Sequence, residues 1–311
     1  MVVAILDLGT NTFHCLIVQI ENNGSFKKIY KTKNPVKLGE GGINKNKIQN
    51  IPFERGIHAL KEFNIKIREC KAEEVYAYGT AALRSAENSQ EFIDRAYEET
   101  GIRIEIISGD LEAEYIYYGV RKALDLGTKN TLIMDIGGGS VEFIIANKEE
   151  IKWAHSFELG AARLLEIFKP NDPITENQIA QAEKYLEENL EMLFSTCLDY
   201  KPQMLIGSSG SFDTFAEMIA HQFYSPQILE NKTEYIFNLE EFNLIYLKLI
   251  ASNRAERTQM KGMIPIRVDM IVIASIFVNL IINKLKIEKM VLSTHAMKEG
   301  ILYSIIEKSK D

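Results

Sequence analysis

Hydrophobic and polar positions follow one pattern twice along this chain. Residues 4–18 read AILDLGTNTFHCLIV, and residues 132–146, lying 128 positions later, read LIMDIGGGSVEFIIA. The matching polar and glycine positions are Asp7 with Asp135, Gly9 with Gly137, and Thr12 with Ser140. Apolar runs on both sides of a short glycine turn predict two strands joined as a β-hairpin. Two copies half a chain apart predict two domains built on one plan.

Strand and helix patterns alternate between the two copies. Residues 74–78 predict a strand, and Asn88 is expected to cap a helix that runs to Thr100 and stops at Gly101. Residues 103–107 predict a β-branched strand, and the next segment, 108–110, begins a helix of about ten residues. This order of elements indicates an α/β fold.

The second half of the chain predicts more helix. A capping box at 175–178 opens a long helix with one apolar face. That face consists of Ile179, Ala182, Leu186, Leu190 and Leu193. A short strand at 203–206 precedes a glycine and serine turn, helices dominate 239–285, and a strand at 289–292 leads to a final helix from about residue 296. We therefore predict two similar domains with mixed sheets, flanked by helices and separated by a cleft.

Composition narrows the class of protein. The chain has 311 residues, of which 46% are hydrophobic and 25% charged, as in a globular protein of about two domains. Its three cysteines are far apart and form no C-x-x-C pair, which argues against a zinc ribbon or a disulfide framework. The amino terminus lacks a signal-peptide pattern, and the apolar run at 270–282 is too short for a bilayer. We expect a soluble cytoplasmic protein with no membrane partner.

The net charge of −7 argues against nucleic acid as a partner, but the charge is uneven. Residues 27–47 contain seven lysines and one acid, so this window carries +6 and the rest of the chain −13. Lysines commonly protect an edge strand from pairing with another chain. A basic strip also attracts a polyanion. Both interpretations stay open at this point.

The two repeated turns are suited to binding phosphate. Each combines small residues, backbone N–H groups and hydroxyls, which lets the backbone approach an anion and donate hydrogen bonds. Asp7 and Asp135, at the strand ends, are placed to hold a hard cation directly or through water. Two such turns that face each other predict a site for a polyphosphate group with Mg²⁺.

Six segments resemble the exopolyphosphatase and guanosine pentaphosphate phosphohydrolase family, within the superfamily of acetate and sugar kinases, heat-shock proteins and actin. They are residues 7–14, 79–84, 107–113, 135–142, 207–211 and 298–303. They occur in the order of the family and cover nearly the whole chain. The resemblance implies two ribonuclease-H-like domains, 1–124 with 296–311 and 125–295. It also implies hydrolysis of the terminal phosphate of a phosphoanhydride chain.

The resemblance assigns catalytic roles to three residues. Glu112 takes the place of the catalytic glutamate, in the first turn of a helix whose amino terminus favours a negative charge. Glu142 corresponds to an acid that positions Mg²⁺ or the attacking water, and Arg84 to a guanidinium that holds phosphate oxygens. Without the resemblance, simpler interpretations are available: Glu112 as a first-turn glutamate, Glu142 as an outward strand residue and Arg84 as a surface arginine. The implied metal ligands are Asp7, Asp135 and Glu142.

The predicted phosphate contacts come from three turns. They are Gly9, Thr10, Asn11, Thr12, Gly137, Gly138, Gly139, Ser140, Gly207, Ser208, Ser209 and Gly210. Arg267 is a weaker candidate. His14 occupies the position of Glu142 in the first repeat, but an interior histidine outside the site is the simpler interpretation.

The chain also departs from the family pattern. Longer members carry a further carboxy-terminal helical domain, so a chain ending at Asp311 is expected to be less processive on long polyphosphate. Lys37 and Lys298 stand where the family has arginine, and lysine lacks the fork geometry that matches phosphate. We expect these changes to affect substrate preference more than the chemical step.

The sequence therefore favours a Mg²⁺-dependent exopolyphosphatase with polyphosphate as substrate. The first alternative is a guanosine pentaphosphate 5′-phosphohydrolase, and a kinase of the superfamily ranks third. An alternative of another class is a non-catalytic sensor of polyphosphate or of guanosine tetra- and pentaphosphate. The resemblance also implies a homodimer.

Overall fold

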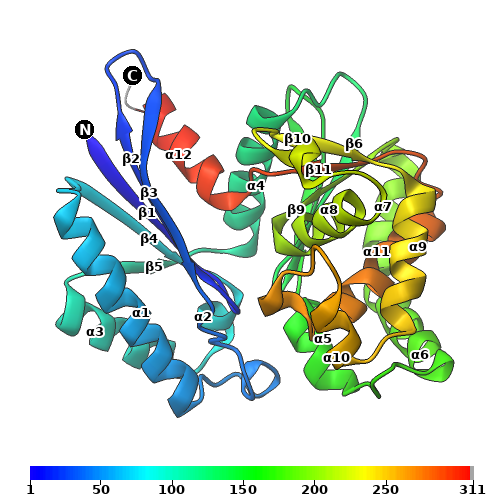
Figure 1. Ribbon diagram of the computed structural model, residues 1–311. Coiled ribbons are helices and arrows are strands. Elements are labelled where there is room, and N and C mark those ends of the chain that lie inside the picture. Colours follow the sequence, from blue (N-terminus) through cyan, green and yellow to red (C-terminus); the bar gives the residue numbers. More distant parts are fainter. Residues whose placement is uncertain (309–311) are drawn as a thin grey trace.

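The first half of the molecule is built on a five-stranded mixed sheet, as seen in the computed structural model, which describes residues 1–308 (Figure 1). Its strands are β1 (Val2–Leu8), β2 (Phe13–Ile20), β3 (Phe26–Asn34), β4 (Glu74–Gly79) and β5 (Ile104–Ile106). The spatial order is β3-β2-β1-β4-β5. The first three strands form an antiparallel meander, and β4 and β5 run parallel to β1.

The second half repeats this topology with one more strand. Its strands are β6 (Thr131–Ile136), β7 (Val141–Ala146), β8 (Ile151–Phe157), β9 (Leu205–Ser208), β10 (Glu234–Phe237) and β11 (Met290–Ser293). Their order is β10-β11-β9-β6-β7-β8, with β6, β7 and β8 as the meander and β9 and β11 parallel to β6. The two ribonuclease-H-like units confirm the duplication that the hairpin repeat predicts.

Helices cover both faces of the sheets. In the first half they are α1 (Asn50–Glu69), α2 (Ala81–Ser85), α3 (Ser89–Thr100) and α4 (Gly109–Ala123). In the second half they are α5 (Ala161–Phe168), α6 (Glu176–Asn189), α7 (Glu191–Tyr200), α8 (Ser209–Phe223), α9 (Leu239–Ile250), α10 (Arg254–Gln259) and α11 (Ile271–Leu285), and α12 (Met297–Lys308) follows β11. Short 3₁₀ turns lie at 43–45, 226–229 and 265–267.

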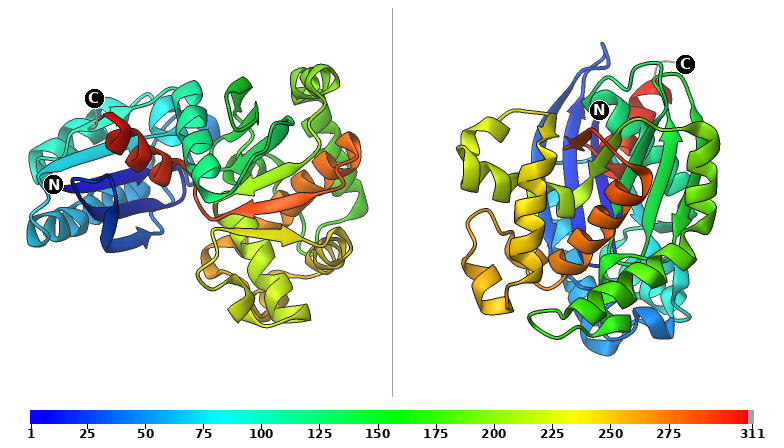
Figure 2. Two further views of the ribbon diagram at one scale, coloured as in Figure 1. Left: turned by 90° about the horizontal axis from the view of Figure 1, so that it is seen from above. Right: turned by 90° about the vertical axis from the view of Figure 1, so that its right-hand side faces the viewer.

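Helices α4 and α12 lie between the two sheets (Figures 1 and 2). They cross closely because Gly119 and Gly300 carry no side chain at the crossing. A Cβ on Gly300 would lie only 1.7 Å from the carbonyl oxygen of Tyr115. One apolar cluster joins them to both sheets, for example through Ile5 and Ile133. The outer faces pack on α1 and α3 in one unit and on helices such as α8 and α11 in the other.

Most predicted elements agree with the structure, with differences in detail. The long helix predicted after residue 175 is interrupted at Leu190, which separates α6 from α7. Helix α4 has 15 residues rather than about ten. Asn88 is at the N-cap of α3, but its side chain bonds the backbone of Ile48 instead of the helix.

The predicted division into domains 1–124 with 296–311 and 125–295 follows the two sheets. It stays a prediction, because α4 packs on β7 and β8 of the second sheet as well as on α12. Among the helices of residues 1–308, none combines the length and the apolar character needed to cross a membrane.

Candidate active site

A cavity of about 140 Å³ lies where the two repeated hairpin turns meet. Strand β1 pairs with β2 in the same register as β6 pairs with β7. Asp7 therefore lies opposite His14, and Asp135 lies opposite Glu142. The cavity walls are Asp7, Gly9, Thr10, Asn11, Thr12, His14, Lys33, Thr80, Ala81, Glu112, Ile116, Asp135, Ile136, Gly137, Gly138, Gly139, Ser140, Ser209, Gly210, Asp213, Ile264, Ile266, Arg267, Thr294, Ala296, Met297 and Lys298. Residues from both ends of the chain thus share one cavity.

The two turns have the same backbone geometry. The amide of Gly9 donates to the carbonyl of Thr12 at 3.2 Å, and the amide of Gly137 donates to that of Ser140 at 3.0 Å. Within residues 1–308, the buried hydroxyls of Thr10 and Thr12 have no hydrogen-bond partner. A buried polar atom without a partner costs about 1–3 kcal/mol, so these hydroxyls favour a ligand with acceptor oxygens.

Glu112 lies in the first turn of α4, whose N-cap Ser108 accepts a hydrogen bond from the amide of Leu111. Its Oε2 accepts a hydrogen bond of 2.9 Å from Nη1 of Arg84, which also donates to the carbonyl of Ile107 at 3.0 Å. Burial raises the pKa of Glu112 well above its ordinary value. The nearby Glu142 carboxyl raises this pKa further, while Arg84 lowers it.

Glu142 is buried, and two hydroxyl groups hold its carboxylate in place. Its Oε1 accepts hydrogen bonds from Ser140 at 2.6 Å and from Ser156 at 2.7 Å. The start of α4 lies against the same Ser156, since a Cβ on Gly109 would lie 2.4 Å from the Cβ of that serine. Burial, together with the charge of Asp135, raises the pKa of Glu142 to about 7. A glycine at the start of α4 therefore lets two acids, Glu112 and Glu142, come close enough to interact.

The two repeated aspartates also carry raised pKa values. Burial raises the pKa of Asp7 to about 7 against the attraction of Lys298, and it raises that of Asp135. Ser208 and Ser209 direct their hydroxyls to Oδ2 of Asp135, at 2.6 and 2.7 Å. The cavity thus gathers more acid than buried cations balance, which favours a cation as part of the ligand.

Three basic residues also line the cavity, namely Lys33, Arg267 and Lys298. Burial lowers the pKa of His14 well below its ordinary value. The positive charges of Lys298, Arg267, Lys33 and Lys31 lower it further. Burial by itself would lower the pKa of Lys298. The negative charges of Glu299 and Asp7 outweigh the effect of burial and raise this pKa. The cavity therefore holds basic groups close to its acids, since the charge of Lys298 acts on both Asp7 and Asp135.

Most of the residues proposed from the sequence meet at this cavity. Glu112, Asp7, Asp135, Ser209, Gly210 and both hairpin turns line it, whereas Arg84, Glu142, Gly207 and Ser208 lie behind its walls. Arg84 reaches the site through Glu112, and Ser208 through Asp135. Gly207 lies in β9, where a Cβ would collide with the ring of Phe212.

Several cavity residues are absent from the sequence-based site. His14 lines the cavity, and its place opposite Asp7 in the repeat is the signal that could have found it. Lys298 and Asp213 were also missed, although Lys298 belongs to a segment that resembles the family. Burial raises the pKa of Asp213 to about 6, and this acid has no counterpart among the residues proposed from the sequence.

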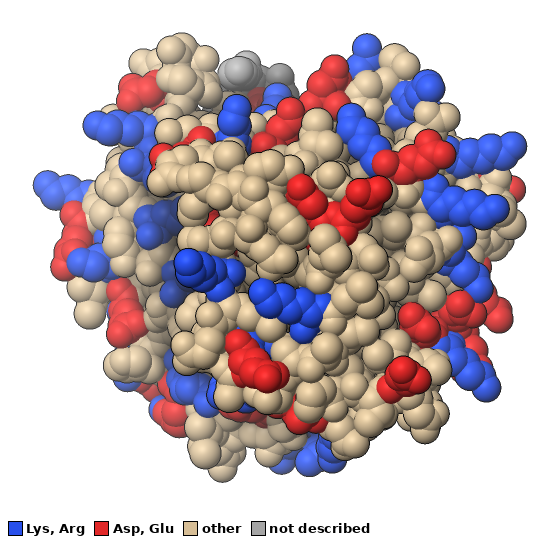
Figure 3. All heavy atoms as spheres, turned by 45° about the vertical axis from the view of Figure 1, so that its right-hand side comes forward, with Lys and Arg blue, Asp and Glu red and all other residues tan. Residues whose placement is uncertain are grey.

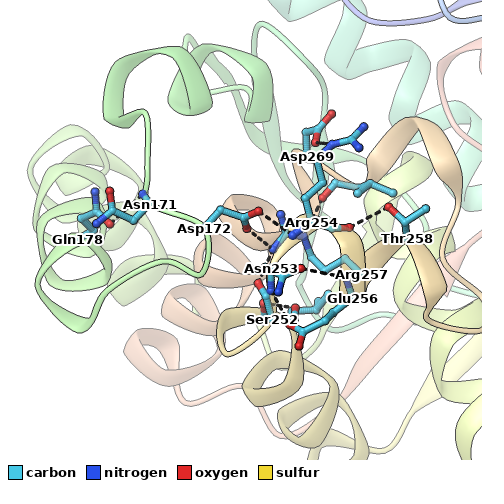
Figure 4. Close-up of polar contacts among 12 residues, drawn as sticks. Asn171, Asp172, Gln178, Ser252, Asn253, Arg254, Glu256, Arg257, Thr258 and Asp269 are labelled. Atoms are coloured by element: carbon cyan, nitrogen blue, oxygen red, sulfur yellow. Dashed lines mark hydrogen bonds and ion pairs between the residues drawn. The ribbon is translucent and has the colours of Figure 1, made fainter.

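Arg267 lines the cavity from the 3₁₀ turn at 265–267. Polar contacts of the buried Arg257 and the exposed Arg254 hold the residues that follow this turn (Figure 4). Arg257 donates to the carbonyls of Val268 and Ser252 and to Oδ1 of Asp172 at 2.8 Å. Its side chain is only 6% exposed. Arg254 pairs with Asp269 beside it.

Replacing Arg257 by methionine should destabilise the protein by about 3 kcal/mol, because two buried carbonyls lose their hydrogen-bond donor and the exposed Asp172 loses its ion pair. Urea denaturation measures this change. Arg254→Met is the matched control, since its pair with Asp269 is exposed and should be worth less than about 1 kcal/mol. Equal losses in the two variants would contradict this role of Arg257.

Replacing Asp7 by asparagine should stabilise the ligand-free protein at pH 8. The folded-state pKa of about 7 lies above the ordinary value of 3.8, so ionisation favours the unfolded chain and stability falls as pH rises between these values. The gain is at most about 4 kcal/mol, measured by denaturation with chelator present. The gain should vanish below about pH 4, where both states are protonated. An exposed acid changed in parallel, Glu98→Gln, should have little effect, and a loss of stability in Asp7→Asn at pH 8 would contradict the assignment.

The acids of the cavity fit Mg²⁺, the ion that the resemblance implies. Within residues 1–308, no three His, Cys, Asp or Glu side chains gather into a complete metal site. Mg²⁺ usually takes one or two carboxylates and completes its shell with water and substrate phosphates. Asp7 and Asp135, both on the cavity wall, match this partial ligand set.

A family model and several known proteins are similar to this chain over most of its length. A model of the Ppx/GppA phosphatase family matches residues 16–309. The chain is 39% identical to an exopolyphosphatase from Cytophaga hutchinsonii of known crystal structure, with 99% of this chain and 98% of that chain covered and a TM-score of 0.94. A family member from Aquifex aeolicus is 25% identical, with 100% and 99% covered and a TM-score of 0.82.

A guanosine-5′-triphosphate,3′-diphosphate pyrophosphatase of Aeromonas salmonicida is also similar, at 29% identity over 316 residues. The match covers 99% of this chain but 60% of that protein's length. The chain therefore spans about three-fifths of the curated relatives that it matches.

Proposed function

Because this chain belongs to the Ppx/GppA phosphatase family, we propose that it is an exopolyphosphatase, which removes the terminal phosphate of inorganic polyphosphate. The observation that carries the proposal is the cavity itself. It unites a buried glutamate paired with arginine, Glu112 with Arg84, and two donor-rich turns with unpartnered hydroxyls.

In this proposal the two turns hold the terminal phosphoryl group through backbone amides and the hydroxyls of Thr10 and Thr12. The carboxylate of Glu112 orients a water molecule and accepts its proton as the water oxygen bonds to the terminal phosphorus. The bridging P–O bond breaks, and the shortened chain leaves with its electron pair. Arg84 keeps Glu112 oriented and charged until the proton moves.

Asp7 and Asp135 would hold Mg²⁺, with Glu142 positioned behind Ser140. When bound, Mg²⁺ neutralises charge on the phosphate oxygens. The protein's own contribution is to keep these acids fixed. The hydroxyls of Ser208 and Ser209 do so for Asp135, and those of Ser140 and Ser156 for Glu142.

Chelation of divalent cations should abolish phosphate release, and added Mg²⁺ should restore it. The reason is the excess of buried acid around the bound phosphates, which leaves charge uncompensated without a cation. A malachite-green assay with EDTA and graded Mg²⁺ measures this. The control is thermal unfolding with EDTA alone, which should show a folded protein. Undiminished release in EDTA would contradict the metal assignment.

A second candidate is hydrolysis of guanosine pentaphosphate, which the curated relative from Aeromonas salmonicida favours by its name. The higher identity and nearly complete coverage of the Cytophaga hutchinsonii exopolyphosphatase favour polyphosphate. The non-catalytic sensor ranks below the enzymes, because the residues in the catalytic positions, including Glu112 and Arg84, are present. A cytoplasmic location and a homodimer remain predictions, and sedimentation equilibrium tests the dimer.

The deciding experiment compares phosphate release from long-chain polyphosphate and from guanosine pentaphosphate, each with Mg²⁺. We expect the higher kcat/KM on polyphosphate. A preference for the nucleotide would favour the second candidate. Tight binding of either compound without phosphate release would overturn the hydrolase and favour the sensor.

A further inference from the structure

Three lysines of β3 lie in one row because of a bulge. Lys33 lies opposite His14 and Lys31 opposite Leu16 in the antiparallel pairing with β2. The register then shifts by one residue between Ile17 and Val18, and Lys28 lies opposite Val18. Directly opposed residues share a face of the sheet, and β2 residues two apart share it too. Lys28, Lys31 and Lys33, called here the lysine row, therefore lie on the face that carries His14.

The lysine row runs beside α12 and ends at the cavity. At its outer end, the ring of Phe26 contacts that of Tyr303 edge-on, with centroids 6.0 Å apart. In the middle, Nζ of Lys31 is 3.5 Å from Oε1 of Glu299. At the inner end, Lys33 lines the cavity together with Lys298. The row is exposed and leads from the cavity outward along α12, which lies against this sheet in Figures 1 and 2.

The charge in the row is only partly balanced. Glu299 pairs with both Lys31 and Lys298, and in residues 1–308 no ion pair involves Lys28 or Lys33. Burial, with the charges of Lys298 and Lys28, lowers the pKa of Lys31, as expected of like charges gathered together. On the face seen in Figure 3, by contrast, basic and acidic side chains are interspersed.

Protection of an edge strand does not account for this arrangement. That role needs charge along the strand but no particular face. Here the bulge brings Lys28 onto the side of Lys31 and Lys33, while Lys27, opposite Gln19, points to the other side. A row that begins at a phosphate-binding cavity suits a ligand that is itself a chain of negative charges.

We propose that the lysine row is a second binding site, which holds the phosphates of a polyphosphate chain that lie outside the cavity. This inference rests on the proposed function. A long polyphosphate chain is larger than this cavity, so most of its phosphates must lie outside it. Because Lys33 and Lys298 line the cavity, a chain that leaves past these two lysines next meets Lys31 and then Lys28. A short substrate can reach Lys33 but ends before Lys31 and Lys28, so the outer part of the row selects for chain length.

The test compares kcat/KM on long-chain polyphosphate with kcat/KM on tripolyphosphate, in low salt. In the double variant Lys28→Gln and Lys31→Gln, the ratio of the two should fall by about tenfold, and the salt dependence of long-chain binding should lose about two units of slope. The matched control, Lys27→Gln and Lys45→Gln, removes two exposed charges of the same segment off the row. The charge-preserving variant Lys28→Arg and Lys31→Arg should keep the wild-type ratio.

An unchanged ratio in the row variant, or an equal fall in the control, would overturn the inference. Failure of the proposed function looks different, because wild type would then release phosphate from neither compound. In that case, direct binding of long-chain polyphosphate to the row and control variants still decides the matter. Weaker binding in the row variant alone supports the row, and equal binding in both overturns it.

Discussion

Replacing Glu112 by glutamine should reduce kcat for phosphate release by between about a hundredfold and ten thousandfold. Glutamine keeps the shape and can still accept the hydrogen bond of 2.9 Å from Arg84, but it cannot take a proton from water. The substrate should therefore still bind, and KM should change little. Steady-state release of phosphate from polyphosphate, with binding measured separately by calorimetry, gives both quantities.

Stability measurements separate lost chemistry from lost structure. Because burial raises the pKa of Glu112, ionisation at neutral pH favours the unfolded chain, so Glu112→Gln should be at least as stable as wild type. Glu114→Gln is the matched control, since Glu114 lies two residues along α4 and bonds the hydroxyl of Tyr118 instead. Activity close to wild type in Glu112→Gln, or equal losses in the two variants, would refute the role of the base.

Local patterns explain why so much of the site could be predicted. The hairpin turns depend on residues within ten positions, so the recurrence of Asp7 as Asp135 already indicated two equivalent strand ends. The position of Glu112 in the first turn of a helix followed from the helix start, which Ser108 caps as expected, whereas its catalytic role came from the resemblance. In both cases the sequence holds the whole cause, because the neighbours along the chain are also the neighbours in space.

The basic wall of the cavity depends on contacts between distant segments. Lys298 follows β11 and meets Asp7 only because α12 returns to the first sheet, and nothing within its own segment indicates this. The bulge opposite Ile17 and Val18 is likewise a property of paired strands. The helix break at Leu190 has the same origin, since Leu190 is fully buried in a cluster built from many helices. Periodicity alone continues the apolar face through it.

Replacing Arg84 by glutamine should lower kcat/KM by about a hundredfold to a thousandfold and should move the acid side of the pH–rate profile to higher pH. The guanidinium lowers the pKa of Glu112 against the effects of burial and of Glu142. Without it, the pKa of Glu112 rises, so a smaller fraction of the base is ionised at neutral pH. Profiles of kcat/KM against pH on polyphosphate measure the shift.

Arg84→Lys distinguishes the charge from the geometry of this contact. A lysine keeps the positive charge, so its pH profile should lie between those of wild type and Arg84→Gln. It cannot bond Glu112 and the carbonyl of Ile107 through a fixed planar group, so the maximal rate should stay low even where Glu112 is ionised. Raised pH should therefore restore part of the rate in Arg84→Gln, the part lost through protonation, and less in Arg84→Lys. An acid limb that stays in place or moves to lower pH in Arg84→Gln would show that Arg84 does not control the ionisation of the base. The arginine would then act by orientation alone.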